Sequence, residues 1–214
     1  MTGPPILVAH RAGNHPDSAR LAVGRADLIE LDVHVRRGRV ELRHAKVLWP
    51  TSRLWERWYL LPRDTEVVLI QSVLDELEAD TPLQLDLKCF TARAAKRIRS
   101  AVGDGRPLHV SSRSWHVLRA FRGRENTVAM RSCASPRQLW LARRLPGLGD
   151  RVGIVAHERL LDRATVRSVR SATSVLFTWA VRSPERAEEL SEAGITGLIV
   201  DDLDLDWPRR QSDR

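Results

Sequence analysis

The sequence predicts an α/β protein whose parallel strands close into a (β/α)8 TIM barrel. Short apolar runs alternate with helical patterns along most of the 214 residues, which indicates a parallel sheet covered by helices. Once a hairpin strand is set aside, eight such runs remain. An open, doubly wound sheet is the alternative, but no glycine-rich phosphate loop follows the first strand to favour it.

The expected strands are short runs rich in leucine and β-branched residues. They lie at Ile6–His10, Leu28–Val33, Val40–His44, Leu83–Leu87, Leu108–Ser112, Thr127–Arg131, Val152–Ala156, Val175–Trp179 and Thr196–Val200. Only Arg37, Gly38 and Arg39 separate Arg36 from Val40, and parallel neighbours need a crossover of about a dozen residues. We therefore expect Val40–His44 to fold back on the second strand as a hairpin with its turn near Gly38.

Helical patterns fill most of the gaps between these strands. They lie at about Asp17–Gly24, Ser72–Glu78, Ala92–Val102, Ser114–Phe121, Pro136–Arg144, Asp162–Ser171 and Pro184–Ala193. Ser183 and Gly194 flank the last of them as an N-cap and a C-terminal glycine. Little chain remains after Val200, so the eighth helix is expected to be reduced. We expect one barrel domain over residues 1–207 and a disordered tail over 208–214.

Composition and charge narrow the class of protein. The formal net charge is +8, which favours anionic partners such as phosphates, but the arginines are scattered along the chain. We therefore expect no nucleic-acid partner. Cys89 and Cys133 are expected to be buried thiols. The start shows no signal-peptide pattern and the apolar runs are too short to span a membrane, so a cytoplasmic protein is expected.

Polar side chains gather at the carboxyl ends of the expected strands, where such barrels place their active sites. These residues are His10, Arg11, Glu30, Asp32, Asp86, Lys88, Ser111, Ser112, His157, Glu158, Trp179, Asp201 and Asp202. We interpret Asp201 and Asp202 as turn or helix-cap acids.

The pair Glu30 and Asp32 requires a counter-charge. Residues two apart in a strand share a face, and two carboxylates on one buried face repel each other. Asp86 adds a third carboxylate from a neighbouring strand. All-oxygen ligation suits a hard divalent cation such as Mg2+ or Ca2+.

Two histidines should lie beside this acidic cluster. The hairpin would bring His44 back to the level of Glu30 and Asp32, and His10 ends the adjacent first strand. Histidines suit general acid and base catalysis near neutral pH. Arg11 and Lys88 would bind a phosphate, so the set indicates metal-assisted phosphoryl chemistry.

The order of motifs resembles the glycerophosphodiester phosphodiesterase family, whose members are phospholipase-C-like TIM-barrel phosphodiesterases of lipid metabolism. The matching motifs are H-R-A-G (10–13), L-I-E-L-D-V (28–33), G-R-V-E-L-R-H (38–44), L-D-L-K (85–88), S-S-R (111–113), F-T-W-A-V (177–181) and G-I-T-G-L-I-V-D-D (194–202). The resemblance implies hydrolysis of a glycerophosphodiester with a divalent cation. It implies roles as acid/base pair (His10, His44), metal ligands (Glu30, Asp32, Asp86), phosphate contacts (Arg11, Lys88) and pocket wall (Trp179).

Four positions depart from the family pattern. Ala12 replaces the glycine of H-R-G, Asp17 replaces the glutamate of P-E-N, Ala45 replaces the aspartate that usually follows the histidine, and Asp86 replaces a glutamate. The segment after His44 is also compact for the family. The set of acidic metal ligands survives these changes, whereas the resemblance does not carry over the pocket that recognises the alcohol of the substrate.

The residues leave several interpretations open. Aromatic residues after His44 (Trp49, Trp55, Trp58, Tyr59) would pack a small subdomain, line a wall for a lipid tail or enter a membrane interface.

The small-molecule substrate would be a glycerophosphodiester cleaved to an alcohol and glycerol phosphate. Alternatives are a lysophospholipase D-like or other phosphodiesterase, including one that forms a cyclic phosphate, and a catalytically silent barrel that binds phosphate or nucleic acid.

Overall fold

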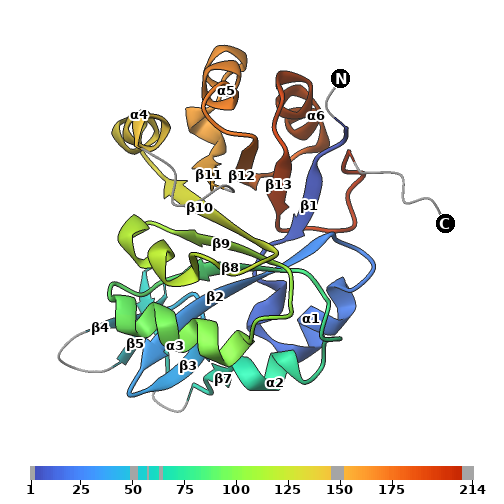
Figure 1. The fold of residues 1–214 in the computed structure, drawn as a ribbon. Coiled ribbons are helices and arrows are strands. Elements are labelled where there is room, and N and C mark those ends of the chain that lie inside the picture. The colour runs from blue at the N-terminus through green and yellow to red at the C-terminus, as the bar shows by residue number, and fades with distance from the viewer. Residues whose placement is uncertain (1–2, 49–52, 57, 63–64, 146–151, 209–214) are drawn as a thin grey trace.

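The computed structural model describes residues 3–48, 53–56, 58–62, 65–145 and 152–208, and a closed ring of parallel strands forms its centre (Figure 1). The ring strands are β1 (Ile6–Ala9), β2 (Leu28–Arg36), β8 (Leu83–Leu87), β9 (Leu108–Ser112), β10 (Thr127–Cys133), β11 (Val152–His157), β12 (Val175–Val181) and β13 (Gly197–Val200). Because β1 pairs in parallel with both β2 and β13, the sheet has no free edge within the ring. The predicted TIM barrel is confirmed.

The predicted hairpin is also confirmed. Strand β3 (Arg39–Leu42) pairs antiparallel with β2, and Arg36 lies opposite Arg39. Both intervening residues have positive φ, 48° at Arg37 and 78° at Gly38, as a two-residue type I′ turn requires. The short strand β7 (Val68–Leu69) pairs with the outer edge of β3.

A separate antiparallel sheet, which the sequence did not indicate, follows the hairpin. It consists of β4 (Lys46–Leu48), β5 (Arg53–Glu56) and β6 (Tyr59–Leu60). Leu54 is buried, but Trp58 is 91% exposed, so Trp58 does not pack a subdomain core. Trp49 lies outside the described residues.

Helices cover the outside of the ring, with α1, α2 and α3 on one side in Figure 1 and α4, α5 and α6 on the other. Their bounds are α1 (Pro16–Ala22), α2 (Ile70–Leu74), α3 (Ala92–Val102), α4 (Pro136–Arg144), α5 (Arg163–Arg170) and α6 (Pro184–Ala193). Three short 3-10 helices are η1 (Ala12–Asn14), η2 (Trp115–Phe121) and η3 (Glu158–Leu160). In the part of the chain that is described, no helix follows β13, as expected.

Four of the expected helices differ in detail, and one of them, α5 (Arg163–Arg170), is one residue shorter at each end than expected. The segment expected as Ser72–Glu78 forms the earlier and shorter α2, and Ser114–Phe121 forms the 3-10 helix η2. Ser114 makes no side-chain capping hydrogen bond, which removes one support for a full α-helix. The expected first helix begins one residue earlier and ends at Ala22. No helix of the described chain is long and apolar enough to cross a membrane.

The interior of the ring is a packed core. Side chains that point inward from the strands form one buried cluster: Val8, Leu28, Met130, Val155, Phe177 and Ile199. A Cβ atom at Gly197 would lie 2.4 Å from the Phe177 ring, so this position needs glycine. Since side chains fill the interior, polar chemistry is confined to the ends of the strands.

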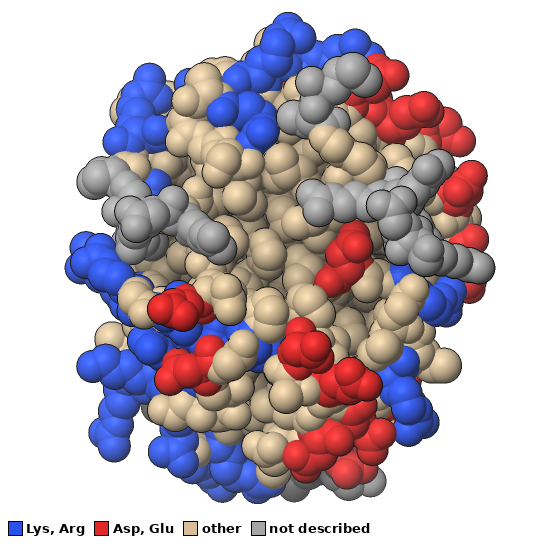
Figure 2. Space-filling view, turned by 45° about the vertical axis from the view of Figure 1, so that its right-hand side comes forward, with Lys and Arg blue, Asp and Glu red and all other residues tan. Residues whose placement is uncertain are grey.

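Surface charge is dispersed on the face shown in Figure 2. Lys and Arg side chains lie mostly around the periphery of that face, and its centre is largely uncharged with several acidic side chains. A nucleic-acid interface usually shows a continuous basic patch. The face shown in Figure 2 has no continuous basic patch of this kind.

Candidate functional site

Three carboxylates meet at the carboxyl ends of β2 and β8. Asp32 lies opposite Asp86 in the parallel register, and Glu30 precedes Asp32 by two residues, so all three share the inward face. Glu30, Asp32 and Asp86 each offer an oxygen atom, and these atoms lie within 4.8 Å of one another. The side chain of Asp32 is 2% exposed and that of Asp86 is 23% exposed. The structure thus brings together the predicted ligand set.

The pKa values of Glu30 and Asp32 are shifted in opposite directions. Burial raises the pKa of Glu30 well above its usual value, and repulsion from Asp32 and Asp86 raises it further. Burial also opposes ionisation of Asp32, but Lys88, the Asn14 amide and the His44 ring together hold its pKa below the usual value. Glu30 and Asp32 therefore differ in opposite directions in how readily they ionise. A hard divalent cation held by the three carboxylates would favour the ionised form of each.

Lys88 lies among the carboxylates. Its Nζ atom is 2.8 Å from Asp32 Oδ1 and also donates to Asp86 Oδ2. Burial lowers the pKa of Lys88, but attraction to Asp86 and Asp32 outweighs this and raises it. The structure places Lys88 at the site as predicted, in contact with acids; its contact with a phosphate stays a prediction.

The loop after β1 binds the same carboxylates from the other side. Arg11 has a left-handed backbone with φ of 57°, and its N–H donates to Glu30 Oε2 at 2.6 Å. The Arg11 Nε atom is 3.6 Å from Asp32 Oδ2. Asn14, which the sequence reasoning missed, donates from Nδ2 to Asp32 Oδ2 at 3.0 Å and accepts from the Asp32 N–H at 2.8 Å. Its position directly after the H-R-A-G motif was the available signal.

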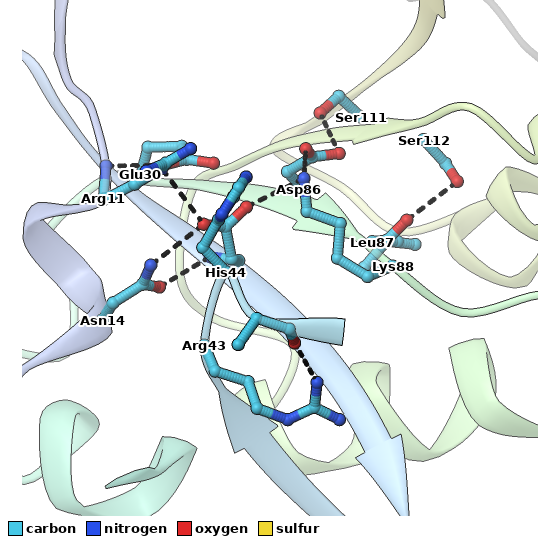
Figure 3. A network of polar contacts seen from close by, with 12 residues as sticks. Arg11, Asn14, Glu30, Arg43, His44, Asp86, Leu87, Lys88, Ser111 and Ser112 are labelled. Carbon is cyan, nitrogen blue, oxygen red and sulfur yellow. Dashed lines mark hydrogen bonds and ion pairs between the residues drawn. The ribbon is translucent and has the colours of Figure 1, made fainter. Parts of the chain in front are cut away.

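Ser111 and Ser112 have different roles at the end of β9. The Ser111 hydroxyl donates to Asp86 Oδ1 at 3.2 Å, whereas the Ser112 hydroxyl donates to the Leu87 carbonyl at 3.0 Å. Figure 3 shows the resulting network, which extends from the Arg11 loop across β2 to Asp86 and Ser111. Ser111 therefore orients Asp86, a candidate metal ligand, and Ser112 joins β9 to β8.

His10 follows β1 directly, at the rim of the ring. Its backbone N–H continues the sheet by donating to the Val200 carbonyl at 2.9 Å. Its ring Nδ1 lies 2.5 Å from Asp201 Oδ1. The interpretation of Asp201 as a turn or helix-cap acid did not include this contact with His10. Asp202 does accept from the Asp204 N–H within a turn, as expected.

His44 reaches the rim by the predicted route. The Arg43 N–H donates to the Asp32 carbonyl at 3.1 Å, which extends the β2–β3 pairing to the residue before His44. The His44 Nδ1 atom lies 2.5 Å from Glu56 Oε1 on β5. Glu56 was not predicted, because its position depends on the pairing of the small outer sheet.

The opposite side of the rim carries an aromatic pair. Trp179 on β12 lies opposite His157 on β11, and their rings meet edge to face with centroids 5.6 Å apart. Burial lowers the pKa of His157, and the positive charges of Arg159, Arg113 and Arg182 lower it further. Trp179 thus lies at a strand end as predicted, and its role as a pocket wall stays a prediction.

Comparison with known proteins places this architecture among solved phosphodiesterase structures. No protein-family model and no curated protein matches the sequence. A glycerophosphodiester phosphodiesterase from Thermotoga maritima superposes with a TM-score of 0.71 at 17% identity, over 95% of this chain and 97% of that chain. A phosphodiesterase from Oleispira antarctica in complex with the product sn-glycerol-3-phosphate gives 0.65 at 17% identity, over 92% and 93%. A glycerophosphodiester phosphodiesterase from Agrobacterium tumefaciens gives 0.63 at 18% identity, over 94% and 97%.

Proposed function

We propose that this chain is a metal-dependent phosphodiesterase that hydrolyses a glycerophosphodiester to an alcohol and glycerol phosphate. The observation that carries the proposal is the buried cluster of Glu30, Asp32 and Asp86, whose ligand oxygens lie within 4.8 Å at the mouth of the barrel. Its shared fold with the solved glycerophosphodiester phosphodiesterases supports the choice of reaction. The bound product of the Oleispira structure supports a small-molecule substrate.

The chain's own residues divide the work of hydrolysis. A cation held by the three carboxylates would draw negative charge from the phosphate when bound. Arg11 and Lys88 would orient the phosphate from either side of the cluster. Lys88 would have to exchange part of its contact with Asp32 and Asp86 for the substrate.

The two histidines transfer the protons. One takes a proton from the attacking water as its oxygen bonds to phosphorus, and the other gives a proton to the alcohol oxygen as the phosphorus–oxygen bond breaks. In both rings Nδ1 lies 2.5 Å from a carboxylate oxygen, which leaves Nε2 to exchange protons with the reactants. His10 and His44 are the proposed acid/base pair.

A second candidate substrate is a lysophospholipid. Trp55, Trp58, Tyr59 and Leu60 are exposed on or beside the small sheet that carries Glu56 to His44. Exposed aromatic residues next to a polar site favour contact with an acyl chain or a membrane interface. In an alternative route, a neighbouring substrate hydroxyl attacks phosphorus in place of water and closes a cyclic phosphate, while the bond from phosphorus to the head-group alcohol breaks and that alcohol leaves with a proton.

The test is a metal-titrated turnover screen on glycerophosphodiesters and lysophospholipids, with phosphorus NMR of the products. The wild type should turn over at least one substrate only with Mg2+ or Ca2+, and His10→Ala and Glu30→Gln should lose this activity. Glu188→Gln, which removes one exposed acid on α6, is the matched control. Absence of turnover by the folded wild type on the whole panel with either metal would overturn the proposal.

A further inference from the structure

We propose that Glu56 is a positioning residue for His44, so that the small outer sheet β4–β5–β6 forms part of the catalytic apparatus. The inference rests on the proposed function in one respect, since it assumes that His44 transfers a proton. Its structural basis is independent of any substrate. The Glu56 Oε1 atom lies 2.5 Å from His44 Nδ1, and the two side chains are 18% and 33% exposed.

The register of the small sheet brings Glu56 to this place. Lys46 pairs with Trp55 in the antiparallel β4–β5 ladder, so the next position along the ladder sets Glu56 opposite Ala45. His44 is the residue before Ala45. The antiparallel pairing of β4 with β5 therefore brings the Glu56 carboxylate beside the His44 ring.

Both ends of this contact are held by the surrounding structure. The Arg43 guanidinium donates to the Ala45 carbonyl and pairs with the buried Glu41, whose Oε2 lies 3.1 Å from Arg43 Nε. On the other strand, Leu54 is buried and its carbonyl accepts from the Leu61 N–H at 2.8 Å. The His44–Glu56 pair thus joins two anchored segments and is not a contact between two free side chains.

A carboxylate on one ring nitrogen decides what the other nitrogen can do. An ionised Glu56 accepts a hydrogen bond from Nδ1–H, which fixes the neutral tautomer with its lone pair on Nε2. The same bond limits rotation of the ring and stabilises the imidazolium after proton uptake. Without Glu56, His44 would sample both tautomers and more than one ring orientation.

Nitrogen-15 NMR of the histidine rings, combined with steady-state kinetics, tests the inference. The chain has 7 histidines, and a His44→Gln spectrum identifies the His44 signals. In the wild type, His44 should show a protonated Nδ1 and an unprotonated Nε2 when neutral. In Glu56→Gln the two nitrogens should move toward tautomer-averaged shifts, and Glu56→Asp should show the same direction because its carboxylate is withdrawn.

The kinetic measurements separate a positioning role of Glu56 from a role in folding. Loss of a partner that orients a functional histidine typically costs about 10–100-fold, so kcat should fall by that factor in Glu56→Gln while KM changes little. Glu188→Gln is the charge-matched control and should leave both the His44 signals and kcat at wild-type values. Unchanged His44 nitrogen shifts in both Glu56 variants would overturn the inference, even if kcat fell.

The two proposals can fail separately. If the wild type turns over no substrate, the proposed function fails, while the tautomer shift in Glu56→Gln still decides whether Glu56 positions His44. If the wild type is active and Glu56→Gln matches Glu188→Gln in kcat, the positioning role fails and the proposed function stands.

Discussion

The two halves of the barrel use the same β/α architecture for different purposes. In the half formed by β1, β2, β8 and β9, the strand ends carry a buried ionic network of carboxylates, a lysine and an arginine. In the half formed by β10 to β13, the rim carries the His157–Trp179 pair, and Asp201 after β13 reaches across to His10. The chemistry is therefore concentrated on one side of the mouth.

The same division appears in local regularity. Helices α4, α5 and α6 each begin with a side-chain cap, from Ser135, Asp162 and Ser183 respectively. In the first half Thr91 caps α3 in the same way, but the five-residue α2 and the 3-10 helix η2 have no side-chain cap. The outer strands that support His44 also lie beside this half. The helices without a side-chain cap thus lie in the half that carries the candidate site.

Removal of either proposed acid/base residue should give the largest loss of kcat and show which half of the rim carries the chemistry. His10→Ala and His44→Ala should each lower kcat by about 10²–10⁴-fold, because general acid or base catalysis is lost. His157→Ala, on the opposite side of the rim, should lower kcat far less. Steady-state kinetics on the best substrate of the screen measures all three. An equal loss in His157→Ala would mean that the chemistry spans both halves.

Glu30→Gln should stabilise the metal-free fold and weaken the binding of a cation. Because burial and two neighbouring acids raise the pKa of Glu30, its ionised form is disfavoured in the fold. Glu30→Gln should therefore unfold at higher urea than the metal-free wild type at pH 7. A cation at 100 times its dissociation constant should stabilise the wild type by about 2.7 kcal/mol and the variant much less. The same cation response in both proteins would contradict the assignment of Glu30 as a ligand.

The contact between the two halves at His109 should contribute to the loss of folding stability in acid. His109 on β9 stacks on Phe177 of β12 with ring centroids 5.2 Å apart, and burial lowers the pKa of His109 from 6.5 to about 4. A base with a lowered pKa binds fewer protons when folded, so its contribution to stability is lost as pH falls from 6.5 towards 4.

His109→Leu should make the stability curve less steep over that range, by at most about 1.4 kcal/mol per pH unit. Urea unfolding of wild type and variant in matched buffers measures the difference. Parallel curves for the two proteins would show that His109 is not buried in its neutral form.

Loss of a helix cap in the second half should give the smallest effect and leave activity alone. The Asp162 side chain accepts from the Thr165 N–H at 2.6 Å at the start of α5. Asp162→Ala should lower the free energy of unfolding slightly, because α5 loses its side-chain N-cap. Urea denaturation checks the stability and the turnover assay checks kcat. A loss of kcat comparable to that of His10→Ala would break the division between the two halves.

Local signals explain which parts of the molecule the sequence predicted. Strands β8 and β9 and helices α3, α4 and α6 match their predicted bounds, because apolar periodicity and caps are encoded in neighbouring residues. The acidic cluster was predictable for the same reason, since strand alternation and strand order place Glu30, Asp32 and Asp86 together.

Contacts that depend on long-range register were not predictable. Asp201 meets His10 across 191 residues, only after the ring closes between β13 and β1. Glu56 meets His44 only once the weakly patterned strands β4 and β5 have paired. In both cases the residue type was visible in the sequence, but its partner was set by tertiary structure.

Calorimetric titration of Mg2+ and of Ca2+ into metal-free protein tests the central claim most directly, with wild type compared with Asp86→Asn. Asp86 is a sharp choice because its side chain is 23% exposed and the change preserves its size. The account predicts one cation site per chain in the wild type and strongly weakened binding in the variant. Equal binding by both proteins, or no binding by the folded wild type, would contradict the assignment of Glu30, Asp32 and Asp86 as a metal site.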